Sequence, residues 1–263
     1  MSKLGKLINC LFVEQKKFFK SNLPLLTILA FTLVPFMAGF FMFVLKDPES
    51  AENLGFISTK AQILGDTTVS WSAYLELLTQ AISVGGLFVF GFIMAWIFGR
   101  EYSDKTLNNL LALPISRNII VFAKFVVAFL WCCLLGVFVF TLGIIVGSFI
   151  QIPGWSTEVL LQGATTFIIC SLLTVVLSIP VAFFACIGKS YLTPIGFIVF
   201  TVVFSQIITA IGYGEIFPWS IPALASGISG NPVLKHYSIL VVIVVGILGW
   251  FMTSIWWKYA DQP

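Results

Sequence analysis

The sequence predicts an all-α integral membrane protein. Hydrophobic residues make up 59% of the 263 residues, whereas Asp, Glu, Lys and Arg together make up only 10%; a soluble domain carries about 25% charged residues. The mean hydropathy is +1.04. Six runs without a charged residue are long enough to cross a bilayer, which takes about 20 apolar residues in a helix. These features argue against a soluble enzyme, a disordered chain and a coiled coil.

We expect six transmembrane helices in a single membrane domain that covers 1–263. Unbroken apolar runs favour helices, which satisfy their backbone groups internally as lipid requires. The alternating pattern of a β-barrel, with turns about every ten residues, is absent. The expected spans are about 23–45, 77–98, 122–149, 163–186, 192–211 and 237–257.

Two shorter segments complete the expected fold. Residues 1–20 place apolar side chains at helical spacing between lysines, a pattern typical of an amphipathic helix in the membrane interface. The apolar stretch Ile216–Leu234 contains three prolines, and proline blocks a continuous helix. It predicts one or two re-entrant helices between spans 5 and 6, with an ordinary structured loop as the alternative.

The distribution of basic residues predicts the orientation. With both termini inside, the inner segments hold eleven Lys and Arg residues and the outer segments hold three. This asymmetry is typical of a multi-pass protein with cytoplasmic termini. A basic inner face meets anionic lipid, and nothing in the sequence indicates nucleic-acid binding.

Side chains that could perform chemistry within the membrane are scarce. No ionisable residue lies in the middle of an expected span, whereas ion-coupled carriers usually place one there. His236 is the single histidine, so a metal site with several histidines is excluded. His236 itself is either a pH sensor or a solvated interfacial residue. Gly188-Lys189-Ser190 resembles the end of a phosphate loop, but Phe183 stands where that motif needs glycine.

The five cysteines form no C-x-x-C pair, and none falls in an expected outer loop. Structural disulfides are therefore not expected. Because the membrane portion lacks a catalytic site and an obvious coupling-ion site, any transport must draw its energy from a partner.

The loop between spans 2 and 3 is the most informative stretch. Ser103 and Asp104 can cap a helix, and Leu107, Leu110 and Leu111 then form an apolar ridge before Pro114 ends it. This helix of about ten residues suits docking into a groove of another protein. The alternative is a helix that merely lies on the bilayer.

In the third span, Gly143 and Gly147 match a small-xxx-small spacing, which allows close helix packing. The pair can pack against a helix of the same chain or form a dimer seam.

Several residues of the loop carry a resemblance to a known family. Glu101, Thr106, Leu110–Leu111 and Leu113-Pro114-Ile115-Ser116-Arg117, followed by Lys124, resemble the pattern of permease subunits of type-2 ABC exporters. That family has an interfacial N-terminal helix, six spans and re-entrant helices between spans 5 and 6. The stretch Phe217–Ala223 is similar to the outer segment of small permeases in bacitracin-resistance and lantibiotic-immunity transporters.

The resemblance implies partners and residue roles. Two cytoplasmic ABC ATPase subunits would pair with two copies of this chain, or with this chain and a related permease. ATP and Mg would bind to the ATPase, with no cofactor on this chain and no enzyme activity of its own. Coupling to the ATPase would involve Glu101, Ser103, Asp104, Thr106, Leu107, Leu110, Leu111, Pro114 and Arg117. The outer re-entrant segment would place Pro218, Trp219 and Pro222.

The resulting hypothesis is a permease subunit, in a bacterial plasma membrane, of an ATP-driven exporter that confers resistance to a peptide antibiotic. One alternative is an exporter of another substrate, such as sodium or a lipid-linked molecule. Another is a sensor or scaffold that recruits a partner without moving a substrate.

Overall fold

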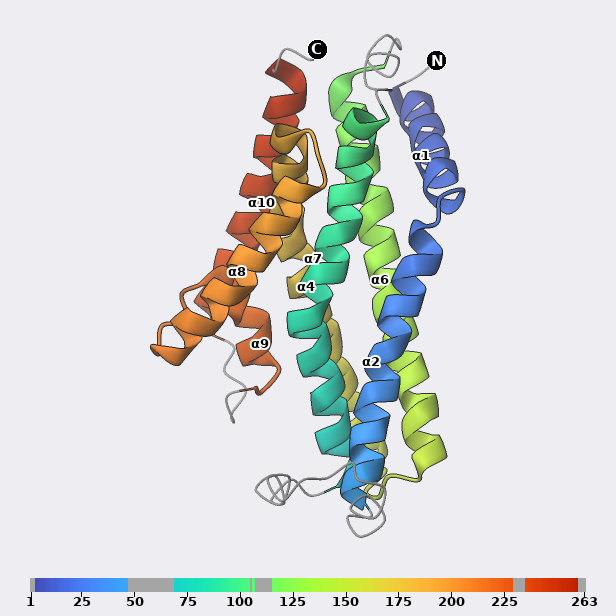
Figure 1. Cartoon of the computed structure of the whole chain (residues 1–263), viewed down its shortest axis with the longest axis vertical. Coiled ribbons are helices and arrows are strands. Elements are labelled where there is room, and N and C mark those ends of the chain that lie inside the picture. The colour runs from blue at the N-terminus through green and yellow to red at the C-terminus, as the bar shows by residue number, and fades with distance from the viewer. Residues whose placement is uncertain (1–2, 47–68, 105, 107–114, 229–234, 260–263) are drawn as a thin grey trace.

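The computed structural model of the chain describes residues 3–46, 69–104, 106, 115–228 and 235–259. Over these ranges the chain is helical and contains no β-strand. Six helices in them are long and apolar enough to cross a membrane. Figure 1 shows an elongated bundle with both termini at the same end, as an even number of crossings requires. The prediction of an all-α protein with six spans is confirmed.

The six spans agree with the expected ranges at their centres and differ at their ends. They are α2 (Leu23–Lys46), α4 (Trp71–Ser103), α6 (Arg117–Ile150), α7 (Thr157–Gly188), α8 (Leu192–Ala210) and α10 (His236–Tyr259).

Three of these helices are longer than the bilayer requires. α4, α6 and α7 have 33, 34 and 32 residues, which at about 1.5 Å per residue is about 50 Å, against about 30 Å of hydrocarbon. They therefore project beyond the membrane. Their extra turns carry Glu76, Arg100, Arg117 and Glu158, so a search for charge-free runs stops short of the true helix ends.

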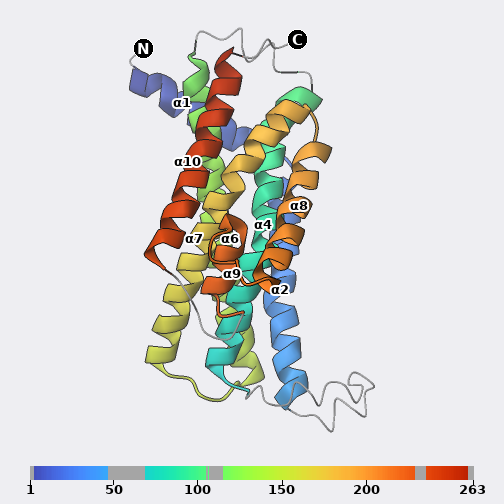
Figure 2. The same ribbon diagram turned by 90° about the vertical axis from the view of Figure 1, so that its left-hand side faces the viewer.

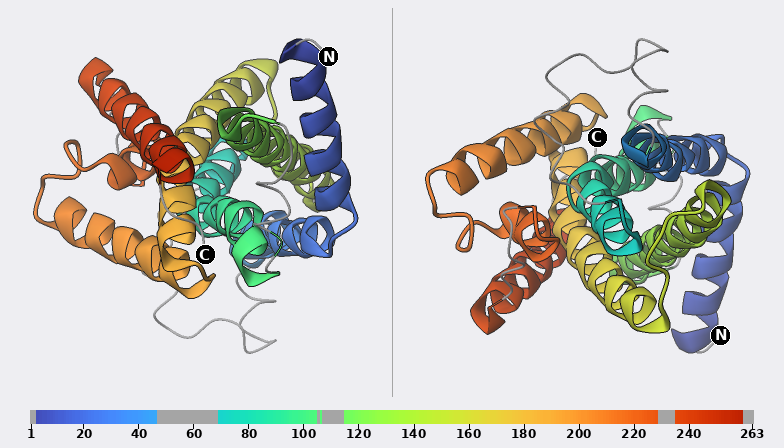
Figure 3. Two further views of the ribbon diagram at one scale, coloured as in Figure 1. Left: turned by 90° about the horizontal axis from the view of Figure 1, so that it is seen from above. Right: turned by 90° about the horizontal axis from the view of Figure 1, so that it is seen from below.

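The centre of the bundle is the pair α4 and α7. These helices pack against each other along their length, and 61% of the most apolar window of each is buried. Seen along the long axis, α8, α9 and α10 lie on one side of this pair, and α1, α2 and α6 lie on the other (Figure 3). The spans at the periphery of the bundle, α2, α8 and α10, keep apolar faces exposed, as helices in contact with lipid do.

Gly143 and Gly147 of α6 both lie against α4. A Cβ atom at Gly143 would come 2.5 Å from Leu78 Cδ1, and one at Gly147 would come 2.6 Å from the Trp71 ring. The Tyr74 hydroxyl donates a hydrogen bond to the Gly143 carbonyl at 3.0 Å. The two glycines therefore contribute to helix packing inside this chain. The dimer seam stays an untested alternative.

The first helix, α1 (Lys3–Phe19), is inclined to the spans and lies against α6 at the end where α4 and α10 finish (Figure 2). Leu4 and Phe12 are 67% and 66% exposed, whereas Cys10, Glu14 and Phe18 are buried. Apolar side chains thus face away from the bundle, where lipid would cover them. The buried face contains a carboxylate, which the helical pattern did not predict.

The expected re-entrant segment contains two short turns. They are the 3₁₀ helix η2 (Pro218–Ser220) and α9 (Ile221–Ala225), and the latter lies beside α4 and α7, short of their ends (Figures 1 and 2). The Ser220 hydroxyl donates to the carbonyls of Gly214 and Phe217 and so stabilises the break. Residues 229–234 lie outside the described part of the chain, and insertion of the segment into the bilayer stays a prediction.

Hydrogen bonds to Glu215 join the residues before and after this segment. Lys235 and Tyr237 both donate hydrogen bonds to the Glu215 carboxylate. The hydrogen bond from Lys235 lowers the pKa of the Glu215 carboxyl most, and the bond from Tyr237 lowers it further. The start of α10 is therefore tied to the chain that follows α8.

Candidate functional site

A buried lysine joins three helices at the end of the bundle that carries α1. Lys124 of α6 is 1% exposed. Its ammonium donates to Glu101 Oε1 of α4 at 2.9 Å, to Glu14 Oε2 of α1 at 3.1 Å and to the Ile97 carbonyl at 3.1 Å. An ammonium group has three donors, so all of its hydrogen-bonding capacity is used.

Lys17 of α1 completes this group. Its ammonium lies 3.3 Å from Glu14 Oε1 and 3.2 Å from Glu101 Oε1. We call Glu14, Lys17, Glu101 and Lys124 the ion cluster. It contains two carboxylates and two ammonium groups, so its charges balance. A buried charge is costly unless it is paired and hydrogen-bonded. Each of the four charged groups of the ion cluster is hydrogen-bonded to a group of opposite charge.

The ion cluster also holds the start of the loop that follows α4. The Thr106 hydroxyl donates to Glu101 Oε2 at 2.8 Å, and the Thr106 amide donates to the Glu101 carbonyl at 3.1 Å. A carboxylate near the C-terminal end of a helix faces the negative end of the helix dipole, so the lysines are needed to stabilise Glu101 there. Movement of Thr106 would therefore disturb the carboxylate that binds Lys124.

A neighbouring arginine strengthens the junction between α1 and α4. Arg100 donates to Asp104 Oδ2 at 3.1 Å and to the Lys17 carbonyl at 3.3 Å, and its guanidinium lies 4.9 Å from the centre of the Trp96 ring. It thereby satisfies a carbonyl near the C-terminal end of α1, a group that has no partner within its own helix.

The space inside the ion cluster is very small. The cavity among these side chains measures about 10 Å³, room for roughly one water. The charged groups therefore contact one another and leave no room for a bound ligand. These ion pairs connect α1, α4 and α6 to one another.

The other end of the loop is anchored separately. Arg117, the first residue of α6, donates to the carbonyls of Trp257 and Lys258 at 3.0 and 3.3 Å. It thus caps the C-terminal end of α10. Trp257 is fully buried and donates from Nε1 to Cys186 Sγ of α7 at 3.2 Å. The start of the loop between α4 and α6 is therefore anchored beside α1, and its end is anchored to α10.

Comparison with known proteins identifies the family. The sequence profile described as ABC-2 family transporter protein matches residues 10–208. The chain belongs to this family. It is similar to the bacitracin transport permease protein BCRB of Bacillus licheniformis, at 30% identity over 177 residues that cover 67% of this chain and 85% of the relative. The resemblance inferred from the loop is confirmed. This ABC-2 chain is a multi-pass permease subunit, and its ATPase is a separate subunit.

The structure separates the residues for which the sequence predicted one role. Thr106 donates a hydrogen bond to Glu101 of the ion cluster, whereas Arg117 contacts α10. Ser103 is the last residue of α4, and Asp104 is its C-cap, so both belong to the end of a span. The expected residues Leu107, Leu110, Leu111 and Pro114 lie outside the described part of this ABC-2 chain.

The outer segment is remote from the ion cluster. Pro218 begins η2, Pro222 lies in α9, and Trp219 packs edge-on against Phe197 of α8 with the ring centres 5.6 Å apart. Trp219 therefore connects η2 to α8.

Sequence reasoning missed Glu14, Lys17 and Arg100 as site residues. Glu14 is the single acid among the first 20 residues, and that isolation among lysines was the available signal. Lys124 entered only as part of the family resemblance. Its position two residues inside the expected third span could have indicated that a buried partner exists.

Proposed function

We propose that this chain is the membrane subunit of an exporter that protects a bacterium against an amphipathic peptide antibiotic. The observation that carries the proposal is the similarity to a bacitracin transport permease over most of both chains. The spans support it, because large apolar side chains such as Leu130, Phe149 and Leu161 are exposed along them. An amphipathic substrate could therefore enter sideways from the lipid.

The end of the bundle with α1 faces the cytoplasm in this proposal. Basic residues gather there, and both termini lie at that end (Figure 1). The basic residues of the described segments at this end are Lys3, Lys6, Lys16, Lys17, Lys20, Arg100, Arg117, Lys124, Lys189 and Lys258. Basic segments remain on the cytoplasmic side of membrane proteins, so the ATPase would dock at this end.

Within residues 103–113, the part that follows the end of α4 is the proposed coupling helix, and the ion cluster is the proposed route from it to the spans. The helix would occupy a groove of the ATPase, with α1 as a second contact. When the ATPase dimer closes on ATP, Thr106 would move with the helix and pull on Glu101. Because Glu101 binds Lys124 of α6 and Lys17 of α1, these helices would follow. Such a switch requires different contacts in its two states.

The proposed assembly contains two ATPase subunits and two permeases, the second being an identical copy or a related chain. ATP and Mg bind to the ATPase subunits. Such a complex, reconstituted in vesicles, should hydrolyse ATP faster when a peptide antibiotic is added.

Resistance in cells tests the function directly. Deleting the gene for this chain should increase susceptibility to a bacitracin-like or lantibiotic peptide, and a plasmid copy should restore resistance. A copy paired with an ATPase that cannot hydrolyse ATP should not restore it. Unchanged susceptibility after deletion would refute peptide protection. Normal resistance with the inactive ATPase would instead indicate a sensor or scaffold.

A further inference from the structure

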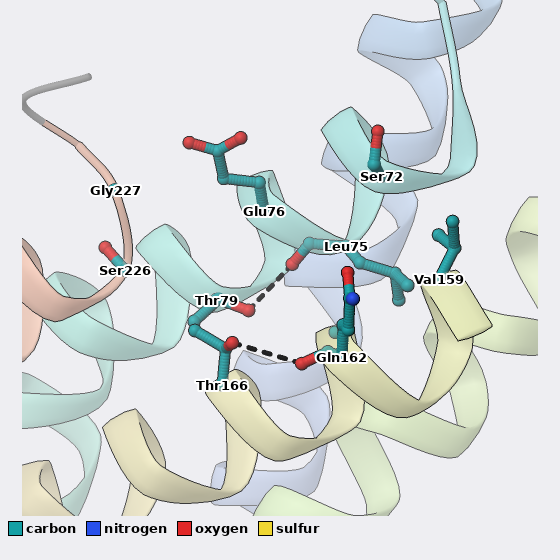
Figure 4. A pocket seen from close by; sticks show the side chains of 10 residues that line it. Ser72, Leu75, Glu76, Thr79, Val159, Gln162, Thr166, Ser226 and Gly227 are labelled. Carbon is teal, nitrogen blue, oxygen red and sulfur yellow. Dashed lines mark hydrogen bonds between the residues drawn. The ribbon is translucent and has the colours of Figure 1, made fainter. Parts of the chain in front are cut away.

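A polar cavity lies at the end of the bundle opposite the ion cluster. It measures about 210 Å³ and lies between the first turns of α4 and α7, and the residues that follow α9 close one side (Figure 4). Its polar lining consists of one carboxylate, one amide and four hydroxyls. These belong to Glu76, Gln162, Ser72, Thr79, Thr166 and Ser226.

Three of the four hydroxyl groups of this cavity are set up to accept hydrogen bonds. Thr79 donates its proton to the Leu75 carbonyl at 2.7 Å, Ser226 donates to the Ala223 carbonyl at 2.7 Å, and Thr166 donates to the Gln162 carbonyl at 3.1 Å. Since each proton is used on the backbone, the lone pairs of these oxygens remain for another donor. The cavity therefore favours a group rich in N–H donors.

Glu76 gives the cavity a negative charge. Its carboxylate accepts a bond from Gln80 Nε2 at 3.3 Å, and within the described ranges no lysine or arginine forms an ion pair with it. Gly227 lies beside the carboxylate with φ +83°, and a Cβ atom there would come 2.7 Å from Glu76 Oε1. Glycine thus lets the backbone close over the carboxylate.

The size and the apolar part of the lining define the group that fits. Pockets for drug-sized ligands measure about 300–1,000 Å³, so a cavity of about 210 Å³ suits one side chain of a larger molecule. Leu75 and Val159 supply apolar surface next to the oxygens. A methylene stem that ends in an ammonium group matches both surfaces, whereas a bare metal ion would leave most of the space unfilled.

We propose that this cavity binds the ammonium end of an aminoalkyl side chain of the transported peptide, with Glu76 as its counter-ion. The inference rests on the proposed function, which places this end of the bundle at the outer face. The cavity would then hold the peptide on the side from which the antibiotic arrives or to which it is released.

Photolabelling tests the proposal on the full chain. The chain is co-expressed with its ATPase, and the purified complex is then reconstituted in lipid nanodiscs. The probe is an alkyl amine that carries a diazirine. In the wild-type protein, label should concentrate in residues 72–79 and 159–166, and Glu76→Gln should reduce it about tenfold, as expected for loss of a charge-assisted hydrogen bond. Glu158→Gln is the matched control, because Glu158 stands in the first turn of α7 but outside the cavity lining; its labelling should stay normal.

A competition on the wild-type protein needs no variant. The unlabelled amine should displace the probe, and its N-acetyl derivative, which has no charge, should need about tenfold more for the same effect. Equal competition by both compounds would overturn the proposal, and so would normal labelling of Glu76→Gln. The cell assay separates the two ideas: if deletion leaves susceptibility unchanged while labelling depends on Glu76, peptide protection fails and the ammonium site stands.

Discussion

Lys124 and Glu101 stand on neighbouring spans, 23 positions apart in the chain, with 2.9 Å between the ammonium nitrogen and the nearer carboxylate oxygen. Both side chains are almost completely buried. When an ion pair is buried, the desolvation penalty exceeds the electrostatic attraction between the charges unless the geometry is good and further hydrogen bonds are made. Glu14, Lys17 and Thr106 supply the additional bonds, and together they connect α1 and the loop after α4 to the bundle.

Removing the central charge should destabilise the protein strongly. Lys124→Met leaves two buried carboxylates with a single lysine, and loss of one partner of a buried pair costs about 3–5 kcal/mol. Thermal unfolding of the purified protein in detergent measures the effect. Lys16→Met is the control, since Lys16 is an exposed lysine of α1 and should be close to neutral. Equal melting of the two variants would show that the ion cluster is solvated and unimportant.

Thr106→Val should uncouple the loop from α4 without unfolding the bundle. The variant loses the hydroxyl that donates to Glu101, at a cost to stability of about 1 kcal/mol. We expect near-normal melting but reduced peptide-stimulated ATP hydrolysis in the reconstituted complex. Thr141→Val is the matched control, because that exposed hydroxyl bonds only within α6. Full stimulation of the Thr106 variant would contradict the route proposed here.

Arg117→Ala should loosen the end of α10. The guanidinium caps the carbonyls of Trp257 and Lys258, and loss of a charged hydrogen bond costs about 1.5–3 kcal/mol. Hydrogen exchange should become faster over residues 253–259 and remain unchanged over α1. Accelerated exchange in α1 instead would mean that the two anchors of the loop are not separate.

The contact between α7 and α10 predicts a further effect on stability. A Cβ atom at Gly249 would come 2.8 Å from Pro180 N and Cα, which are backbone atoms and cannot rotate away. Gly249→Ala should therefore destabilise the protein by about 1–3 kcal/mol through overpacking. Gly196→Ala is the control, since nothing lies within 4 Å of a Cβ atom there, and alanine is the better helix former. A Gly249 variant as stable as the control would disprove this packing.

The spans could be predicted because each crossing demands a long run without charge. α2 and α8 begin at the residues expected, Leu23 and Leu192. Both ends of α4 and the starts of α6 and α7 were not predictable in this way, since these turns leave the hydrocarbon and can carry charges such as Glu76 and Arg117.

The site was predictable only where its residues are close in sequence. Glu101, Thr106 and Lys124 belong to one continuous pattern, so a resemblance to the family identified them. Glu14 lies 110 positions from Lys124, and their pairing depends on how α1 packs against α6. No local periodicity contains that information, because the buried carboxylate of α1 breaks the amphipathic pattern on which the helix was predicted.

Docking of the ATPase through residues 103–113 is the central claim, and co-purification of the ATPase with a Leu110→Asp, Leu111→Asp double variant tests it most directly. If these leucines form the apolar ridge, the two charges should abolish co-purification while membrane insertion persists. Asn108→Asp with Asn109→Asp adds the same charge to the same segment and should retain the ATPase. Normal recovery of the ATPase with the leucine variant would contradict the account.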